Sequence, residues 1–337
     1  ESGLGQLDYV LGSKICFPID YPYRPGISVP LREHMERLID VLISKNKLKP
    51  GSLVVDIGSN DGTLLSFFKD KGMEILGVEP TNMAKVAKDN KIKTVQKFFT
   101  KEVARNIVNK YGRAKMITMT NVFAHMATLG EVMRGISILL DEDGIVFSES
   151  QYLLDVLEGN QFDEIYHDHI RIYSLKSLVR LFPYYGMEVF DAKRVQTREG
   201  SIQVFAGWKG KHSISSDVNK LLKVEEDAGL FDPKEWIKFR KRVLKQKEQY
   251  LNTLDKVNIV ADSCPTRGVV LLNYYGLDRS KIPYVAQLPG TEKVGKYIPG
   301  THNPIVSNEV ILKKEPDYIL ILAWHYSDYI IKNWRTK

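Results

Sequence analysis

The sequence predicts an α/β protein in which an N-terminal arm precedes a doubly wound parallel sheet, and a second, smaller α/β domain follows. Three observations support this prediction. Apolar runs of strand length alternate with segments of helical periodicity between residues 53 and 148. A glycine turn, Gly58–Gly62, directly follows the first apolar run. After a long charged helix, a second alternating series begins at Val257.

The elements of the main domain follow from periodicity. Residues Leu31–Leu48 carry apolar side chains at helical spacing and end before Pro50-Gly51, which predicts a helix leading into the first strand. The alternating strands and helices that follow are typical of a parallel sheet with crossover helices. The strands are predicted over Leu53–Ile57, Ile75–Val78, Lys115–Met119 and Gly144–Ser148, and the helices over Thr63–Lys71, Asn82–Asn90, Thr100–Tyr111 and Leu129–Leu140.

The remaining elements close this sheet and begin another. A helix at Leu175–Phe182 precedes two runs that read as an antiparallel pair, Glu188–Arg194 and Ser201–Ala206. A long charged helix, 233–256, leads to the second series: strands at Val257–Ala261, Tyr284–Gln287 and Tyr318–Ala323, and a helix from Arg267. Composition shifts near Lys209-Gly210-Lys211. We therefore expect an arm and helix acting as a lid over 1–48, a ligand-binding domain over 49–210 and a Rossmann-like domain over 211–337.

Composition narrows the class of protein. The two cysteines form no CxxC pair, and no apolar stretch approaches the ~20 residues of a membrane span, which favours a soluble protein of a reducing, cytoplasmic compartment. The net charge of +7 is diffuse, and its densest run, 234–247, has the apolar spacing of an exposed helix. A nucleic-acid partner is thus disfavoured, although the sequence leaves it open, and it says nothing of oligomeric state. Because the chain begins at Glu1 without a methionine, it reads as a truncated or processed piece.

The glycine turn and the next strand predict the ligand. The turn lacks the G-x-G-x-x-G pattern that brings backbone amides to a pyrophosphate. Its aspartates suit instead a cationic ligand with a ribose and an amino-acid tail, which describes S-adenosylmethionine (SAM). The second strand ends in an acid placed to accept hydrogen bonds from ribose hydroxyls. The run resembles motif I of class I SAM-dependent methyltransferases, and the expected cofactor contacts are Asp56, Gly58, Asn60, Asp61, Gly62, Glu79, Pro80, Asn121 and Phe123.

Reactive side chains concentrate in Glu164–His169, close to the edge where the ligand is expected. A metal site would need a third ligand that the sequence does not offer, so no metal is predicted. Acid–base or hydrogen-bonding catalysis and structurally satisfied histidines both stay open. His125, just past the strand at Lys115–Met119, should line the pocket wall. The aromatic and proline-rich segment Tyr21–Ser28 reads as a lid or as a packed arm.

Several motifs together resemble the SAM-dependent sugar C-methyltransferases, which methylate carbon 3 of nucleotide-linked 4-keto deoxysugars. The resemblance covers nearly the whole chain and includes motifs peculiar to that family. They are Gly3–Leu7, Tyr21 and Tyr23, Arg32–His34, motif I, Asn121–His125, Gln151–Leu154, Tyr166–His169, Lys296–His302 and Leu322–Trp324.

The resemblance implies a mechanism and a set of residues. A carbon beside a ketone becomes nucleophilic once a base removes its proton and a donor steadies the enolate oxygen. By resemblance His169 is the base, and Tyr166 and Asp168 position it or the sugar. His125 and the tyrosines of the arm would assist substrate binding, and the C-terminal domain would hold the nucleotide. The implied substrate contacts are Tyr21, Tyr23, Arg267, Lys293, Lys296 and His302.

The chain also departs from that family, and the departures keep other functions open. The family's Tyr-His-Glu-His carries Asp168 here, an arginine usual in a Gly-Ser-x-Arg turn is Gln203, and the N-terminal zinc-binding cysteines are absent. The glycine-alanine-lysine turn of the second domain reads Asp262–Gly268, and His325 replaces an asparagine. The alternatives are a methyltransferase acting on an O or N centre of another small molecule or an RNA end, and a non-catalytic SAM-binding module.

Overall fold

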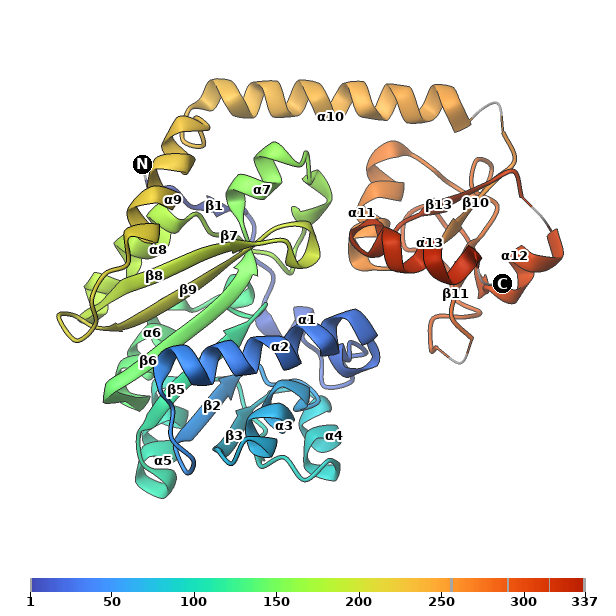
Figure 1. Ribbon diagram of the computed structural model, residues 1–337. Helices are drawn as coiled ribbons and strands as arrows, with labels where there is room; N and C mark the ends of the chain where they lie inside the picture. The colour runs from blue at the N-terminus through green and yellow to red at the C-terminus, as the bar shows by residue number, and fades with distance from the viewer. Residues whose placement is uncertain (1, 255–256, 290, 315, 336–337) are drawn as a thin grey trace. The chain divides into compact units, whose positions relative to one another are not determined.

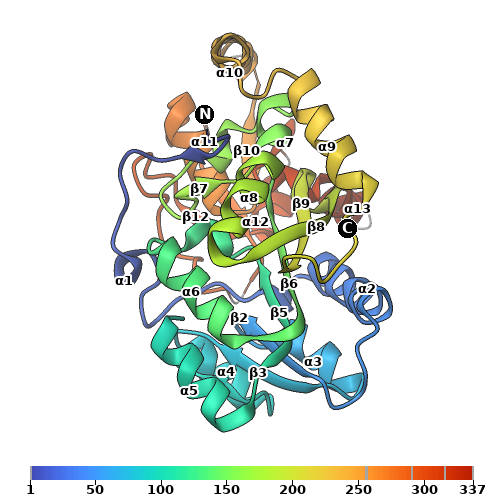
Figure 2. The ribbon, with the colours of Figure 1, turned by 90° about the vertical axis from the view of Figure 1, so that its left-hand side faces the viewer.

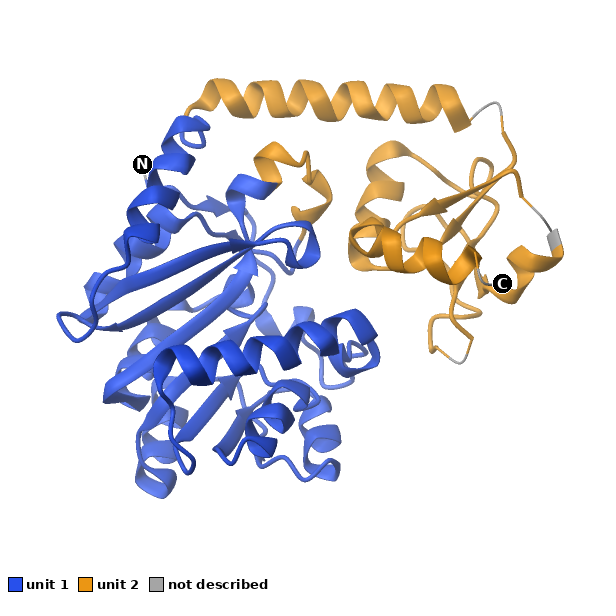
Figure 3. Cartoon of the chain, in the orientation of Figure 1, with its two compact units in different colours: residues 1–155, 167–231 blue, residues 156–166, 232–337 orange. Residues whose placement is uncertain are grey.

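The computed structural model describes residues 2–254, 257–289, 291–314 and 316–335. The chain divides into two compact units, shown in Figure 3. Unit 1 comprises residues 1–155 and 167–231, and unit 2 comprises 156–166 and 232–337. The chain therefore passes from one unit to the other at three places. Each unit is described separately below.

Unit 1 is built on a mostly parallel sheet, in which the described residues form seven strands in the order β4-β3-β2-β5-β6-β9-β8. The strands up to β6 run parallel, and β9 and β8 are antiparallel to their neighbours. This confirms the predicted doubly wound sheet with an antiparallel pair at one end. The strands are β2 Leu53–Ile57, β3 Glu74–Val78, β4 Thr94–Val95, β5 Ala114–Thr120, β6 Leu140–Gln151, β8 Met187–Val195 and β9 Ser201–Trp208.

Helices cover both faces of this sheet. Helices α2 and α3 pack on one face through a shared core that includes Leu42, Phe68 and Phe147, while α5 and α6 pack against each other on the opposite face (Figures 1 and 2). Every residue of β2 is buried, as expected for a central strand covered from both sides. The helices are α1 Ser13–Cys16, α2 Val29–Asn46, α3 Thr63–Asp70, α4 Met83–Asp89, α5 Lys101–Tyr111, α6 Leu129–Leu139, α7 Leu153–Glu158, α8 Leu175–Leu181 and α9 Ser216–Asp227.

The unit boundary differs from the one expected at residue 211. Helix α9 packs against β8 and belongs to unit 1. Its Glu225 is fully buried and accepts a hydrogen bond from the Tyr152 hydroxyl at 2.8 Å. The backbone amide of Lys176 donates to the same carboxylate at 3.1 Å. The shift in composition near Lys209 therefore marks the turn after β9, and the larger segment of unit 2 begins after Phe231.

An N-terminal strand that the sequence analysis missed also belongs to unit 1. Strand β1, Gly5–Gln6, pairs antiparallel with β7, Arg171–Ile172. The Ser174 hydroxyl also holds the arm, because it donates to the carbonyl oxygen of Gly3 at 2.6 Å. The arm is thereby anchored directly after the segment that contains the histidines.

Unit 2 is a smaller Rossmann-like unit, as predicted. Its described residues form a parallel sheet of four strands in the order β12-β11-β10-β13. The core gathers apolar side chains such as Leu272, Val285 and Ile298. The elements are α10 Pro233–Leu254, β10 Ile259–Asp262, α11 Thr266–Tyr275, β11 Val285–Gln287, β12 Ile305–Ser307, α12 Glu309–Lys314, β13 Tyr318–Ile321 and α13 Ser327–Arg335.

Candidate active site

The glycine turn lies between β2 and α3, at the carboxyl end of the parallel strands, where ligands of doubly wound sheets bind. Gly58 and Gly62 have φ values of +74° and +79°, and Asn60 between them has +47°. A Cβ atom on Gly58 would lie 2.5 Å from Val122 Cγ2, and one on Gly62 would lie 2.9 Å from Ile92 Cγ1. Glycine is therefore required at both positions, because a side chain would clash and the backbone is left-handed.

Glu79 directly follows β3 beside this turn, and its side chain is buried. Its Oε2 accepts a hydrogen bond from the Asn60 backbone amide at 3.0 Å. Its Oε1 accepts from the Thr81 amide at 2.9 Å and the Thr81 hydroxyl at 2.6 Å. A carboxylate has about four acceptor positions, so one remains on Oε2 for a ligand hydroxyl. Thr81, which the sequence analysis missed, fixes the orientation of this carboxylate.

The two aspartates of the motif have partners inside the protein. The Thr118 hydroxyl donates to Asp56 at 2.7 Å, and burial raises the pKa of Asp56 to about 7. Asp61 accepts hydrogen bonds from the Gly26 amide at 3.1 Å and from the Thr63 hydroxyl at 2.7 Å. Their carboxylates hold the sheet, the helix start and the arm, so direct contact of either with the cofactor stays a prediction.

The segment after β5 supplies a polar group without a protein partner. Asn121 adopts a φ of +55°, and its backbone N–H donates to the Glu149 backbone carbonyl oxygen at 2.6 Å. Its side-chain Oδ1 is buried and has no hydrogen-bond partner among the described residues. Such an orphaned acceptor is expected where a ligand donor binds. Phe123 stacks on Tyr173 with ring centroids 5.0 Å apart and is fully buried, whereas Pro80 is half-buried after Glu79.

The N-terminal arm lies against the glycine turn. The carbonyl oxygen of Tyr23 accepts a hydrogen bond from Asn60 Nδ2 at 3.1 Å. The rings of Tyr21 and Tyr23 meet edge to face with centroids 6.4 Å apart. Phe17 contacts Tyr21 on one side and His125 on the other, each with centroids 5.5 Å apart. The arm therefore connects the turn with the histidine cluster.

Three histidines and one aspartate lie beside the arm. His125 Nδ1 is 2.6 Å from the carbonyl oxygen of Asp168, and its ring stacks on that of His169 with centroids 5.0 Å apart. Burial, with the nearby His169 as the next contribution, lowers the pKa of His125 to about 3. His169 is 4% exposed, whereas His167 is exposed and lies 3.3 Å from an Asp168 carboxylate oxygen. Burial raises the pKa of Asp168.

In unit 2, the environment of Arg267 corrects one expectation. Its guanidinium is buried, with Nε 2.9 Å from Asp163 Oδ2 and Nη1 2.7 Å from Glu164 Oε1. It also lies over the Trp324 ring, 4.4 Å from the centroid. Because two carboxylates neutralise this cation, Arg267 is not suited to bind an anionic nucleotide. Tyr166 also belongs to this unit.

The other cations predicted in unit 2 remain available. Lys293 donates to the Cys264 carbonyl oxygen at 2.6 Å, which leaves two of its three hydrogens for other acceptors. Lys296 and His302 are exposed, and His302 has a φ of +57°. Lys293 and Lys296 precede Ile298 in the sequence, and His302 follows it. The Ile298 side chain is fully buried in the core of the unit.

Two polar groups at the carboxyl end of β6 were not assigned a role from the sequence. Glu149 is 1% exposed and accepts from His34 Nε2 at 2.9 Å and from Gln203 Nε2 at 2.6 Å. Arg198, in the loop between β8 and β9, donates from Nη2 to the Tyr23 hydroxyl at 2.7 Å. Because β9 is antiparallel to β6, the loop before β9 lies at the ligand edge, but the direction of the Arg198 side chain depends on the conformation of that loop.

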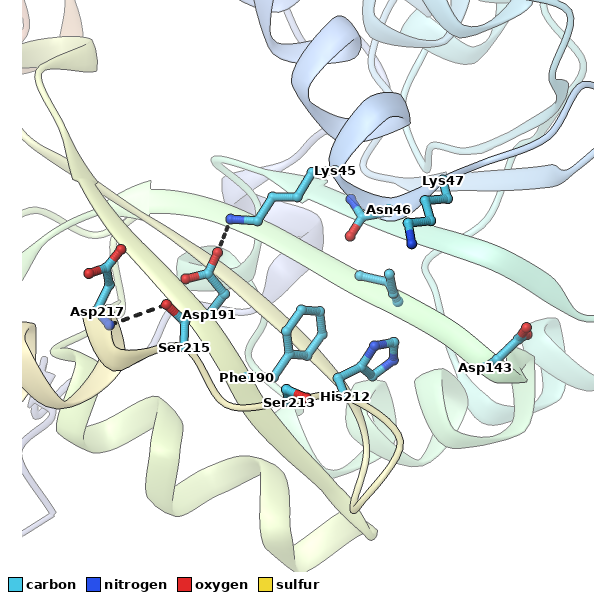
Figure 4. A pocket seen from close by; sticks show the side chains of 11 residues that line it. Lys45, Asn46, Lys47, Asp143, Phe190, Asp191, His212, Ser213, Ser215 and Asp217 are labelled. Carbon is cyan, nitrogen blue, oxygen red and sulfur yellow. Dashed lines mark hydrogen bonds and ion pairs between the residues drawn. The ribbon is translucent and has the colours of Figure 1, made fainter.

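A further hollow in unit 1 lies away from the glycine turn. The hollow in Figure 4 is lined by Lys45, Phe190 and His212 and lies where β6 begins, at the sheet edge opposite the glycine turn. Among the described residues no group of three or more His, Cys, Asp or Glu side chains could hold a metal ion. Within those same ranges, no helix has the length and apolarity that crossing a membrane requires.

Comparisons with known proteins show to which family the chain belongs. Residues 31–192 match the family described as methyltransferase domain, and residues 196–336 match the C-methyltransferase C-terminal domain. The C-methyltransferase NovU of Streptomyces niveus is 34% identical over 320 residues, covering 93% of this chain and 76% of NovU. A SAM-dependent methyltransferase structure from Anabaena variabilis is 14% identical, with a TM-score of 0.42, covering 51% of this chain and 84% of that one. For magnesium protoporphyrin IX methyltransferase of Synechocystis with bound S-adenosylhomocysteine, the values are 13%, 0.40, 52% and 81%.

The strand order, the glycine cradle and the buried acid after β3 define a class I SAM-dependent methyltransferase, which uses SAM as its methyl donor. The similarity to NovU extends through both units. This chain belongs to the SAM-dependent C-methyltransferases.

Proposed function

We propose that this enzyme methylates carbon 3 of a nucleotide-linked 4-keto deoxysugar and that His169 is the general base. The observation that carries the proposal is the stack of the buried His169 on the half-buried His125, beside the arm. C-methylation requires removal of a carbon-bound proton, and this cluster offers a base beside the cofactor cradle. The sugar nucleotide follows from the motifs shared with sugar C-methyltransferases.

His169 is better suited than its neighbours to take the proton. A general base works best when its pKa lies near the working pH. Burial lowers the pKa of His125 to about 3, so His125 holds a proton too weakly. His167 is exposed to solvent and lies against Asp168. His125 would instead orient the His169 ring by stacking, and the Asp168 backbone would fix His125 through its 2.6 Å contact.

The proposed reaction has two steps, the removal of a proton and the transfer of a methyl group. His169 takes the proton from the carbon beside the ketone, and the C–H electron pair forms a carbon–carbon double bond while the carbonyl electrons move to oxygen. When that enolate reverts to the ketone, the carbon attacks the methyl group that SAM supplies on its sulfonium sulfur, and the carbon–sulfur electrons stay on sulfur. The turn at Gly58–Gly62, Glu79 and the orphaned Asn121 Oδ1 would hold the cofactor.

The proposed substrate contacts are residues that the sequence predicted. Tyr21 and Tyr23 would bind the sugar, and Asp168 and Tyr166 would position it or the base. Lys293 and Lys296 of unit 2 would bind the diphosphate, because cations attract an anionic group, and His302 would be a further contact. Arg267 is left out of this proposal, since Asp163 and Glu164 already neutralise it.

The test is His169→Asn, which keeps a polar side chain but cannot take a proton. With nucleoside-diphosphate 4-keto-6-deoxyhexoses as substrates, turnover should fall about 10²–10⁴-fold while SAM binding by calorimetry is unchanged. His212→Asn, at the opposite sheet edge, is the matched control and should retain activity. Retention of more than about a tenth of the turnover in the His169 variant would reject His169 as the base.

A further inference from the structure

The loop between β8 and β9 places a cation at the ligand edge of unit 1. Ser201 of β9 is paired with Gln151 at the end of β6 and with Val195 at the end of β8. The intervening residues therefore lie beyond the carboxyl end of β6, on the edge that carries the glycine turn. Arg198 is at the tip of this loop, and its function is not accounted for by the proposed roles above.

The backbone of this loop is strained and firmly held. Arg198 and Glu199 both have left-handed φ values, 55° and 65°. The Ser201 hydroxyl donates to the Thr197 carbonyl oxygen at 2.9 Å. Gly200 has a φ of +136°, and a Cβ atom there would lie 2.2 Å from Asp155 Cγ, so the loop approaches helix α7 closely. Strained backbone that its surroundings hold in place is concentrated at functional sites.

The side chain of Arg198 points to the arm and the histidine cluster. Its Nη2 donates to the Tyr23 hydroxyl at 2.7 Å, and the Tyr23 carbonyl oxygen accepts from Asn60 of the glycine turn. Burial raises the pKa of Tyr21, and the positive charge of Arg198 opposes that rise. Burial also lowers the pKa of His125, and the same charge contributes in that direction. The guanidinium thus acts on the same groups that surround the proposed reaction.

We propose that Arg198 stabilises the enolate oxygen of the substrate and holds Tyr23 beside it. The inference rests on the proposed function, because it assigns the group that meets the negative charge formed when His169 removes the proton. An arginine guanidinium stays protonated in proteins, so it would donate hydrogen bonds without transferring a proton. The charge on oxygen then returns to the carbonyl bond when the carbon forms its bond to the methyl group. Donors aimed at developing charge are a major source of rate enhancement.

The test compares Arg198→Gln and Arg198→Lys with Arg105→Gln, a control on the exposed face of α5. With a nucleoside-diphosphate 4-keto-6-deoxyhexose that the wild type methylates, the glutamine variant should lose about 10²–10³-fold in kcat. The KM for the sugar and the Kd for SAM should change less than about threefold, and the lysine variant should recover part of the loss. Exchange of the acidic carbon-bound hydrogen with deuterated solvent, measured with S-adenosylhomocysteine bound, should fall by a similar factor.

Two results would overturn the inference while the proposed function stands. One is a rise in KM at unchanged kcat, which would assign Arg198 to the diphosphate. The other is unchanged hydrogen exchange in the glutamine variant. If the wild type methylates no keto sugar of any nucleoside diphosphate, the proposed function fails first, and the assignment of Arg198 to an enolate fails with it.

Discussion

The depressed pKa of His125 gives a direct test of the site geometry. Its ring packs between Phe17 and His169, and desolvation lowers the pKa from 6.5 to about 3. At pH 5 an unfolded chain would carry about 30 protonated His125 rings for each neutral one, whereas the folded protein would carry about 100 neutral rings for each protonated one. The 2.6 Å contact of Nδ1 with the Asp168 carbonyl oxygen is a hydrogen bond when the hydrogen of the neutral ring resides on Nδ1.

The sign of the effect on stability follows from proton linkage. Between pH 6.5 and about 3 the folded state binds fewer protons at His125 than the unfolded state, so acid destabilises the fold. Each pH unit within this window costs about 1.4 kcal/mol, which gives about 2 kcal/mol at pH 5 and about 5 kcal/mol once pH has passed through the folded pKa. Above pH 6.5 this contribution is absent.

Nuclear magnetic resonance of protein labelled with ¹⁵N-histidine measures the pKa directly. The chain has seven histidines, and the His125→Gln spectrum identifies the resonance that belongs to His125. That resonance should keep the shift of a neutral ring with hydrogen on Nδ1 down to pH 5. In urea unfolding, His125→Gln should also remove about 2 kcal/mol of the loss between pH 7.5 and pH 5, whereas His302→Gln should not. A His125 midpoint above pH 5 would refute the reasoning.

Three further predictions concern the cofactor, the substrate and the core of unit 2. Glu79→Ala should cost about 1.5–3 kcal/mol of SAM binding by calorimetry, as for hydrogen bonds to a charged group, while the exposed Glu102→Ala changes nothing. Lys296→Ala should raise the KM for the sugar nucleotide and weaken its salt dependence, and an unchanged KM would leave unit 2 as a scaffold. Asp163→Ala should destabilise unit 2 by about 3–5 kcal/mol in denaturant unfolding followed by tryptophan fluorescence, because it breaks a buried ion pair. A loss below about 1 kcal/mol would contradict that assignment.

The sheet was predictable because its central strands are covered on both faces. The run at 53–57 is apolar except for one aspartate, and the structure buries all five residues. The strand Thr94–Val95 was missed because two residues carry too little periodicity, and β12 was missed for a similar reason. Helix α9 was missed because a shift in composition was read as a domain boundary.

The site was predictable where a local motif fixes it and not where distant residues meet. The glycine turn and Glu79 are separated by one crossover, so their meeting follows from the fold. Arg267 was interpreted wrongly because its partners, Asp163 and Glu164, are far away in sequence. Arg198 was missed because its position depends on a left-handed loop conformation that no periodicity signals.

The chain passes between the two units at three places, which limits where it can be cut into separate domains. Residues 156–166 belong to unit 2, yet they are inserted in the sequence of unit 1, directly before His167. Asp163 in this insert depends on a guanidinium and an indole from the C-terminal part, since Arg267 and Trp324 both donate to it. A chain ending at Phe231 would retain the insert and lose both donors, leaving the Asp163 and Glu164 carboxylates without the guanidinium that neutralises them. We therefore expect a cut at Phe231 to leave an incomplete fragment of unit 2 attached to the methyltransferase unit.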